Sequence, residues 1–335
     1  MQATHKKADR EIERLRREMA AFYAVAQKNA LSKAKTFYET IKPDTDSLLE
    51  EIEKAETDEE KKKAKQKYRA FIVGMVASKA FKDMCQKIAE EMYLANQKAA
   101  AVINSRTPAV YAENYNVTGR GISRDANGYR FKPVTEEEAD KYSGIERQEI
   151  NKEKDTKWNR ANVTRAVIAG ALLGLGAKKI FENVARRTTQ KNRESSNRQA
   201  SDMVTGAESM GRMDSMYRAS DEGFNVEKEW ICTFDNRTRD SHIEYDSMGW
   251  VDLDYEYNTG LKKPKDPNCS IMEEVCNCRC SIGYRVNGLG GSATRSAREG
   301  DVVGSYKRPS SFEDTESVTI ESMSYEEWIK WRGSR

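Results

Sequence analysis

Apolar residues recur every three or four positions through much of the first hundred residues, and this spacing limits what the chain can fold into. Such spacing places them along one face of an α-helix. They are Ile12, Leu15, Met19, Phe22 and Ala26 in a first stripe, and Phe71, Met75, Phe81, Met84, Ile88, Met92 and Ala95 in a second. Pro43 lies between the stripes and is expected to end the first helix. The pattern predicts a helical hairpin or a small bundle over residues 1–106.

The proportion of charged residues indicates that the helices are long and partly exposed. Charged residues make up 33% of the chain and hydrophobic residues 38%, with a mean hydropathy of −0.85. This apolar content is low for a single compact globule. We therefore expect elongated helices around a modest core.

The longest apolar run, residues 166–177, is too short to span a membrane, which takes about 20 residues. We expect a buried helix in which Gly170, Gly174 and Gly176 let another backbone approach closely. No stable membrane insertion is expected. The first 18 residues are largely charged and polar, so we also expect no secretory signal and a protein made in a cytoplasm.

Breaks in the helical pattern divide the rest of the chain. Thr107 and Pro108 open a segment interrupted by glycine and proline, so residues 107–156 are predicted to form an extended arm or linker. A third helical region is expected over residues 157–220. Short runs containing Trp, Ile, Val and Tyr then predict a small Cys-rich α+β module over residues 221–286.

The remaining residues, 287–335, begin with a Gly/Ser-rich stretch and are expected to form a flexible tail. Its end could be a short docking peptide or a folded-back cap, with the apolar residues Tyr325, Trp328, Ile329 and Trp331. Together the segments predict a mostly helical α+β protein, in which long N-terminal helices are followed by the small Cys-rich module.

One stretch of the third helical region concentrates positive charge. The whole chain has 57 basic and 54 acidic residues, so its net charge of +3 says little about partners. Between residues 178 and 198, however, seven residues are basic and two are acidic. The basic residues are Lys178, Lys179, Arg186, Arg187, Lys191, Arg193 and Arg198. They form either a solvated helix face or a contact for DNA phosphates or an acidic partner, without sequence-specific reading of bases.

Five of the six cysteines lie within 49 residues, together with one of the two histidines. Thiolates and imidazole are the usual ligands of structural zinc, which takes four of them. The candidate ligands are His242, Cys278 and Cys280, with Cys232 or Cys269 as the fourth. The single residue between Cys278 and Cys280 is closer than zinc knuckles usually have. Reduced buried thiols and disulfides are the alternatives that the sequence leaves open.

Acidic and basic residues crowd the stretch around His242. Asp235 and His242 could form a metal-dependent nuclease or hydrolase centre with the cysteines. An ion-paired turn around Arg239 that fixes the geometry of a small module explains the same residues. We favour the structural interpretation and assign no reaction and no catalytic residue.

The residues that carry a family resemblance lie between Trp230 and Cys280. In chain order they are Trp230, Asp235, Arg237, Thr238, Arg239, His242, Gly249, Pro264, Asp266, Asn277, Cys278, Arg279 and Cys280. In order and spacing this set resembles the C-terminal domain of phage Mu F-like minor head proteins, the phage head morphogenesis domain. With the similar helix that precedes the motif, the resemblance covers residues 157–286. Cys269 and Cys276 are extra thiols that the family pattern does not explain.

The resemblance implies a minor head protein, also called a minor capsid protein, of a tailed bacteriophage. Such a protein binds the portal protein and capsid or scaffold proteins, is oligomeric in the particle and is needed for head assembly. It could also contact double-stranded DNA during packaging. It would occur in the host cytoplasm during assembly and later inside the capsid near the portal.

Some relatives in that family carry a fused toxin or ADP-ribosyltransferase domain at the C-terminus. In this chain about 50 residues follow Cys280, which is too few for such a domain. The resemblance therefore leads us to expect a protein that acts by binding and is not an enzyme.

Overall fold

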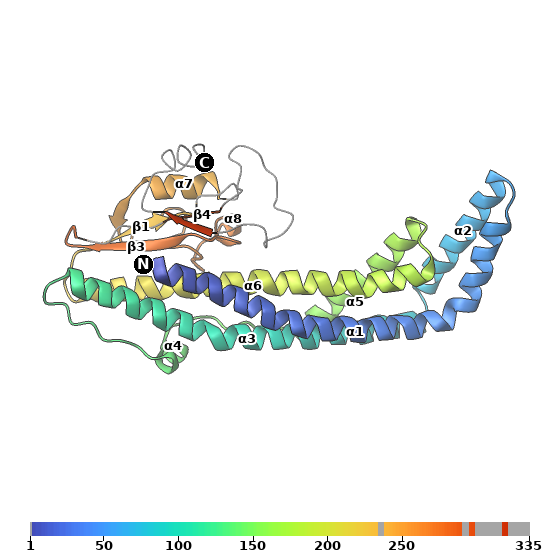
Figure 1. Ribbon diagram of the computed structural model, residues 1–335, viewed down its shortest axis with the longest axis horizontal. Helices are drawn as coiled ribbons and strands as arrows, with labels where there is room; N and C mark the ends of the chain where they lie inside the picture. Colours follow the sequence, from blue (N-terminus) through green and yellow to red (C-terminus); the bar gives the residue numbers. More distant parts are fainter. Residues whose placement is uncertain (1, 234–237, 290–294, 299–316, 321–335) are drawn as a thin grey trace. The chain divides into compact units, whose positions relative to one another are not determined.

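The computed structural model describes the whole chain except residues 1, 234–237, 290–294, 299–316 and 321–335 (Figure 1). The helices are α1 (Gln2–Lys54), α2 (Asp58–Met75), α3 (Lys79–Asp125), α4 (Glu136–Tyr142), α5 (Lys152–Leu172), α6 (Ala177–Asp221), α7 (Asp240–Ser247) and α8 (Met272–Val275). The strands are β1 (Val226–Ile231), β2 (Trp250–Asp252), β3 (Ser281–Val286), β4 (Arg295–Arg298) and β5 (Ser317–Ile320). The predicted class, mostly helical α+β, is confirmed.

The described residues form two compact units. The helical unit consists of residues 15–103 and 147–198, and the sheet unit of residues 1–14, 104–146 and 199–335. Helices α1, α3 and α6 each contribute residues to both units. These boundaries differ from the predicted division at residues 106 and 156, because each long helix was expected to belong to one domain.

The core of the helical unit is built from the two predicted apolar stripes. Leu15, Met19 and Ala26 of α1 are buried, as are Met84, Ile88 and Met92 of α3. Phe22 is only half-buried, and its neighbour Tyr23 takes the core position instead. The 3.6-residue period therefore identified the buried face, with an error of one residue at Tyr23.

A buried polar network runs through this apolar core. The Tyr23 hydroxyl donates to Asn96 Oδ1 and contacts Ser196 Oγ, both at 2.6 Å. Asn96 Nδ2 donates at 2.8 Å to Asp155 Oδ1 and to Asn192 Oδ1. The network joins α1, α3, α5 and α6. Because a buried polar group without a partner is costly, these bonds favour one register of the four helices over others.

The predicted helix ends at two prolines are wrong. Pro43 lies inside α1 and Pro108 inside α3. A proline in a helix interior removes one backbone hydrogen bond. One face of each helix is nevertheless buried near its proline, at Ile41 and Thr45 in α1 and at Thr107 in α3. Burial of these helix faces outweighs the local cost of proline.

Much of the predicted extended arm at 107–156 is also helical. Helix α3 continues to Asp125, through the two glycines that were expected to break it. A Cβ at Gly121 would meet the ring of Tyr284, and one at Gly119 would meet the ring of Phe131. These two glycines allow neighbouring side chains to pack closely against α3. From the sequence alone, a glycine with this role cannot be distinguished from one that ends a helix.

The glycine-rich apolar run forms the end of α5 and a turn, not a single buried helix. Gly174 has a φ of +70° and follows α5, while Gly170 leaves room for Ile180 of α6. Leu172 and Leu173 are 60% and 69% exposed at this turn. Among the described residues no helix has the length and apolarity needed to cross a membrane.

In the sheet unit, β1 is the central strand of an antiparallel sheet with the order β2-β1-β3. Val226 pairs with Val286 and Ile231 with Ser281. The part of α6 in this unit packs on the sheet, since the buried Arg212 donates to the carbonyl of Ile282 at 3.0 Å and to Glu208 at 2.6 Å. Figure 1 shows α7 on the other side of β1.

Strand β3 ends at Val286, the position at which the sequence analysis placed the end of the Cys-rich module. Beyond Val286, β4 and β5 pair as a separate antiparallel sheet. Part of the tail, which was expected to be flexible, therefore forms strands. The docking peptide predicted at Tyr325, Trp328, Ile329 and Trp331 lies outside the described residues.

A buried lysine organises the loop that follows β2. Lys228 of β1 is fully buried, and its ammonium group donates to the carbonyls of Leu253, Tyr255 and Lys262 at 2.6–2.8 Å. It also lies 5.4 Å from the ring centroid of Tyr257. The three N–H donors of the ammonium group thus meet three backbone acceptors.

Lys228→Met should destabilise the sheet unit by about 3 kcal/mol, because it leaves three buried carbonyls without a donor. Urea unfolding followed by tryptophan fluorescence measures this change. Lys262→Met is the matched control: its ammonium group pairs with Asp254 at the surface, and such pairs contribute at most about 1 kcal/mol. Equal losses of stability in the two variants would contradict the role given to Lys228.

Candidate metal centre

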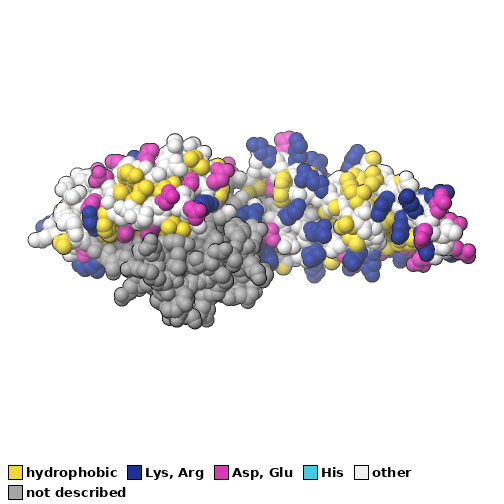
Figure 2. Space-filling view, turned by 90° about the horizontal axis from the view of Figure 1, so that it is seen from above, with side chains coloured by type: hydrophobic (Ala, Val, Ile, Leu, Met, Phe, Trp, Pro, Cys, Tyr) yellow, Lys and Arg dark blue, Asp and Glu magenta, His cyan; other side chains and the backbone are white. Residues whose placement is uncertain are grey.

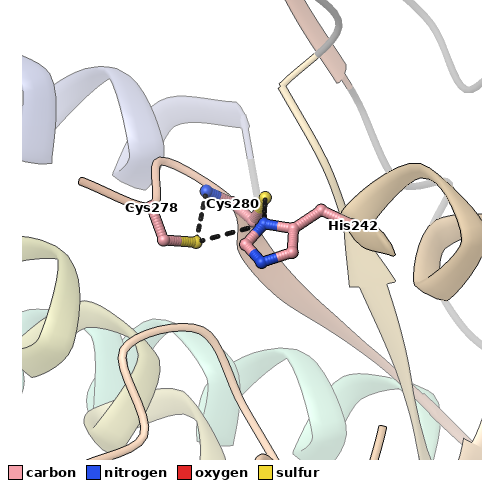
Figure 3. A group of neighbouring side chains, drawn as sticks. All are labelled: His242, Cys278 and Cys280. Carbon is pink, nitrogen blue, oxygen red and sulfur yellow. Dashed lines mark hydrogen bonds between the residues drawn. The ribbon is translucent and has the colours of Figure 1, made fainter. Parts of the chain in front are cut away.

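Three of the predicted ligands meet in the sheet unit. His242 lies in the first turn of α7, and Cys278 and Cys280 lie in the turn that leads into β3 (Figure 3). His242 Nδ1 is 3.3 Å from Cys280 Sγ and 3.7 Å from Cys278 Sγ. One ligand atom from each of the three residues lies within 4.8 Å of the others. His242, Cys278 and Cys280 could therefore hold a metal ion.

Bonds from three other segments fix the turn that carries the two cysteines. Arg239 donates to the carbonyl of Cys276 at 2.5 Å, and the Thr233 hydroxyl donates to the carbonyl of Arg279 at 2.9 Å. The N–H of Asn277 donates to Asp202 of α6 at 3.3 Å. Asn277 has a φ of +56°, a conformation that asparagine tolerates better than most residues. These contacts hold the backbone on both sides of Cys278 and directly before Cys280.

Aromatic rings enclose His242. The indole of Trp230 lies edge-on to the imidazole at a centroid distance of 5.1 Å, and the Tyr245 ring lies at 5.7 Å. Trp230 also packs against Tyr257, and all these residues are buried in one cluster with the cysteines. The cluster excludes water, so interactions between charged groups inside it are stronger than at the surface.

The two thiols in this cluster have opposite pKa shifts. Burial disfavours the thiolate at Cys278, but hydrogen bonds from Cys280 and His242 outweigh this and hold its pKa well below the ordinary value. Burial, followed by the hydrogen bond to Cys278 and its charge, raises the pKa of Cys280 well above the ordinary value. A metal ion bound by both sulfurs would require both thiols to lose their protons.

Of the two candidates for a fourth ligand, the strand register places Cys232 near the other three. Because Ile231 pairs with Ser281, an extension of the same register by one residue would place Cys232 opposite Cys280. The Thr233 hydroxyl donates to the carbonyl of Arg279, so the two segments stay close beyond the strand ends. Directly opposed residues have Cβ atoms about 5 Å apart on the same face. In accord with this, the charge of Cys232 raises the pKa of Cys280.

Cys269 belongs to the same buried cluster, but its thiol donates to the carbonyl of Ile271 at 3.6 Å. Cys276 is half-buried. Among the described residues, the group with metal-ligand spacing consists of His242, Cys278 and Cys280. The sequence did not separate these roles, because all five cysteines share one short window.

The other motif residues shape the backbone around this centre. Asp266 accepts from the N–H groups of Lys262 and Asn268 and so closes the loop that contains the buried Pro264. Gly249 has a φ of +68° directly after α7. The Thr238 hydroxyl donates to the carbonyl of Thr233. Asp235 and Arg237 lie outside the described residues.

Two acidic residues that the sequence analysis did not single out contact this region. Asp202 of α6 accepts from Asn277 and from the Lys265 ammonium group. Glu274 of α8 lies beside His242, with its Oε2 2.9 Å from Nε2. Glu274 precedes Cys278 by four residues, but nothing in the sequence indicates that it faces His242 and that the adjacent Glu273 does not.

The predicted basic stretch lies on α6 within the helical unit. Lys178, Lys179, Arg186, Arg187, Lys191, Arg193 and Arg198 are all exposed. Figure 2 shows many Lys and Arg side chains on the surface of this unit. Exposure is required for a contact with phosphates, and it is also what a solvated helix face shows.

Comparison with known proteins gives one partial match. The chain is 30% identical over 135 residues to the NAD(+)--arginine ADP-ribosyltransferase EFV of Enterococcus faecalis (strain ATCC 700802 / V583). The match covers 38% of this chain and 26% of that protein. No family model matches, and no solved structure matches.

This match corrects one expectation from the sequence. We expected the chain not to be an enzyme, whereas the matching protein is named as one. The expectation relied on the number of residues after Cys280, and chain length is a weak guide to activity because enzyme activity depends on a site and not on size.

Proposed function

We propose that this chain is a minor head protein of a tailed bacteriophage that acts in head morphogenesis. The observation that carries the proposal is the convergence of the motif residues. Trp230, His242, Cys278 and Cys280 are spread over about 50 positions, yet they form one buried cluster. The family resemblance therefore rests on residues that support one another in space.

The partial relative is compatible with this proposal. Minor head proteins fused to an ADP-ribosyltransferase domain belong to the resemblance described above, and the match covers about a quarter of a protein with that name. As partners we propose the portal protein and capsid or scaffold proteins, in the host cytoplasm during assembly and then inside the capsid. The exposed basic residues of α6 are suited to an acidic partner surface or to DNA phosphates.

The assembly proposal predicts a salt-sensitive complex with the portal protein of the same phage. Co-expression followed by affinity purification should recover both proteins at low salt. Arg186→Glu combined with Arg187→Glu should weaken recovery if α6 contributes to the contact, because reversed charges repel an acidic surface.

The matched control for that experiment reverses Lys62 and Lys63, two exposed basic residues of α2. Its recovery should equal that of the wild type. Absence of the portal protein from the low-salt eluate of the wild-type chain would contradict the proposed partner.

We further propose that the metal centre binds a structural zinc ion through His242, Cys278, Cys280 and Cys232. Ligand atoms around tetrahedral zinc lie about 3.8 Å apart, and the three contacting residues already lie within 4.8 Å of one another. The donor set of three sulfurs and one imidazole is typical of structural zinc. Zinc would tie the end of β1, α7 and the turn before β3 together.

Elemental analysis of protein purified without chelator should give about one zinc per chain. The content should fall in a Cys278→Ser, Cys280→Ser double variant and stay unchanged in Cys276→Ser, which removes a half-buried thiol outside the ligand set. Chelator should lower the unfolding temperature of the wild type and of Cys276→Ser, and leave that of the double variant unchanged. A metal-free wild type that is as stable as the metal-treated protein would exclude the zinc site.

The second candidate function is transfer of ADP-ribose from NAD to arginine, which the name of the partial relative favours. Incubation of the purified chain with labelled NAD and an arginine-containing acceptor should then transfer label to the acceptor. Boiled protein is the control. An acceptor that stays unlabelled at high protein concentration would set this candidate aside.

The nuclease alternative has less support from the site. The imidazole of His242 is 1% exposed, and its Nδ1 faces the two sulfurs. A general base must come within hydrogen-bond reach of the water that it activates. In this arrangement His242 is positioned as a ligand, so we do not propose cleavage of DNA.

A further inference from the structure

The two ring nitrogens of His242 face different groups. Nδ1 faces the sulfur atoms of Cys280 and Cys278, whereas Nε2 lies 2.9 Å from Oε2 of Glu274. The two side chains are 1% and 12% exposed. A carboxylate thus lies on the opposite side of the imidazole from the thiols, at the edge of the buried cluster.

This arrangement has a consequence for the tautomer of His242. A nitrogen that coordinates a metal uses its lone pair, so coordination through Nδ1 leaves the proton on Nε2. A buried N–H without an acceptor is costly. Among the described residues Nε2 makes no hydrogen bond, and Oε2 of Glu274 lies 2.9 Å from it. Glu274 is therefore the acceptor within reach of this N–H.

A second contact holds Glu274 in place. The hydroxyl of Ser241 lies 3.1 Å from both carboxylate oxygens of Glu274. Ser241 directly precedes His242 in α7, so α7 supplies both the imidazole and a donor that fixes the carboxylate beside it. Glu274 lies in α8, and the neighbouring Glu273 of the same helix is exposed.

We propose that Glu274 is a positioning residue for the metal centre. Its carboxylate fixes the Nε2–H tautomer of His242 and so directs Nδ1 toward the metal. The proposal depends on the zinc site proposed above and adds a group that does not itself coordinate the ion. A carboxylate in this place also makes the imidazole a better donor, because it partly offsets the positive charge that the ring acquires on coordination. Loss of such a partner typically lowers metal affinity about 10–100-fold.

The test compares the wild type with Glu274→Ala, Glu274→Gln and the control Glu273→Ala. Each protein is titrated with Co²⁺ in competition with a chelator, and absorption from thiolate coordination reports binding. We expect Glu274→Ala to bind about 10–100-fold more weakly. Glu274→Gln should recover part of this loss, since its amide oxygen can still accept from Nε2–H. Glu273→Ala should bind like the wild type.

Proton NMR of the zinc-treated proteins supplies a readout that a role in folding alone would not change. An imidazole N–H held by Glu274 should exchange slowly with water and give a resolved signal in the wild type. The signal should be absent in Glu274→Ala, while thermal unfolding shows that the variant remains folded. With two histidines in the chain, a His5→Gln variant assigns the signal to His242.

The possible results separate the two proposals. If the wild type binds no Co²⁺ or Zn²⁺, the zinc site is excluded and the role of Glu274 with it. If the wild type binds metal and Glu274→Ala binds equally tightly, the zinc site stands and the role of Glu274 is overturned. Weaker binding by a folded Glu274→Ala, with partial recovery in Glu274→Gln, supports both.

Discussion

Antiparallel pairing of β1 with β3 is the interaction on which the Cys-rich module depends. It joins segments about 50 residues apart, and its register is set by six consecutive pairs from Val226 with Val286 to Ile231 with Ser281. A slip by one residue would turn every side chain of a strand to the other face. Trp230 would then leave His242, and Cys232 would leave Cys280. The geometry of the metal centre is thus a consequence of strand register, with α7 and the turn before β3 completing it.

Sequence patterns predicted those parts of the molecule in which one physical effect dominates. Burial of one helix face explains why Leu15, Met19, Ile88 and Met92 could be recognised as core residues. Clustering of thiols with one histidine likewise identified His242, Cys278 and Cys280. Both patterns can be read from a short stretch of sequence. Both agree with the folded structure because they depend on hydrophobicity and on metal-ligand chemistry.

The prediction failed where tertiary contacts override local preference. Pro43 and Pro108 lie inside helices because one face of each helix is buried near the proline. Gly121 also lies inside a helix, where the ring of Tyr284 leaves no room for a Cβ. The contact of Glu274 with His242 could not have been found from the sequence, because it depends on the direction in which the four-residue helix α8 points. Cys232 became the favoured fourth ligand only through the strand pairing.

The side-chain nitrogen of Lys228 is a covalently tethered donor inside the sheet unit, where burial lowers its pKa to about 7. It gathers three carbonyls of the loop after β2, as a bound ion would, but no chelator can remove it. In the zinc site that we propose, the cysteine end of the same strand would instead need an ion from the surroundings. On that proposal, one strand joins a part that the chain stabilises with its own side chain to a part whose completion would depend on the metal supply of the cell.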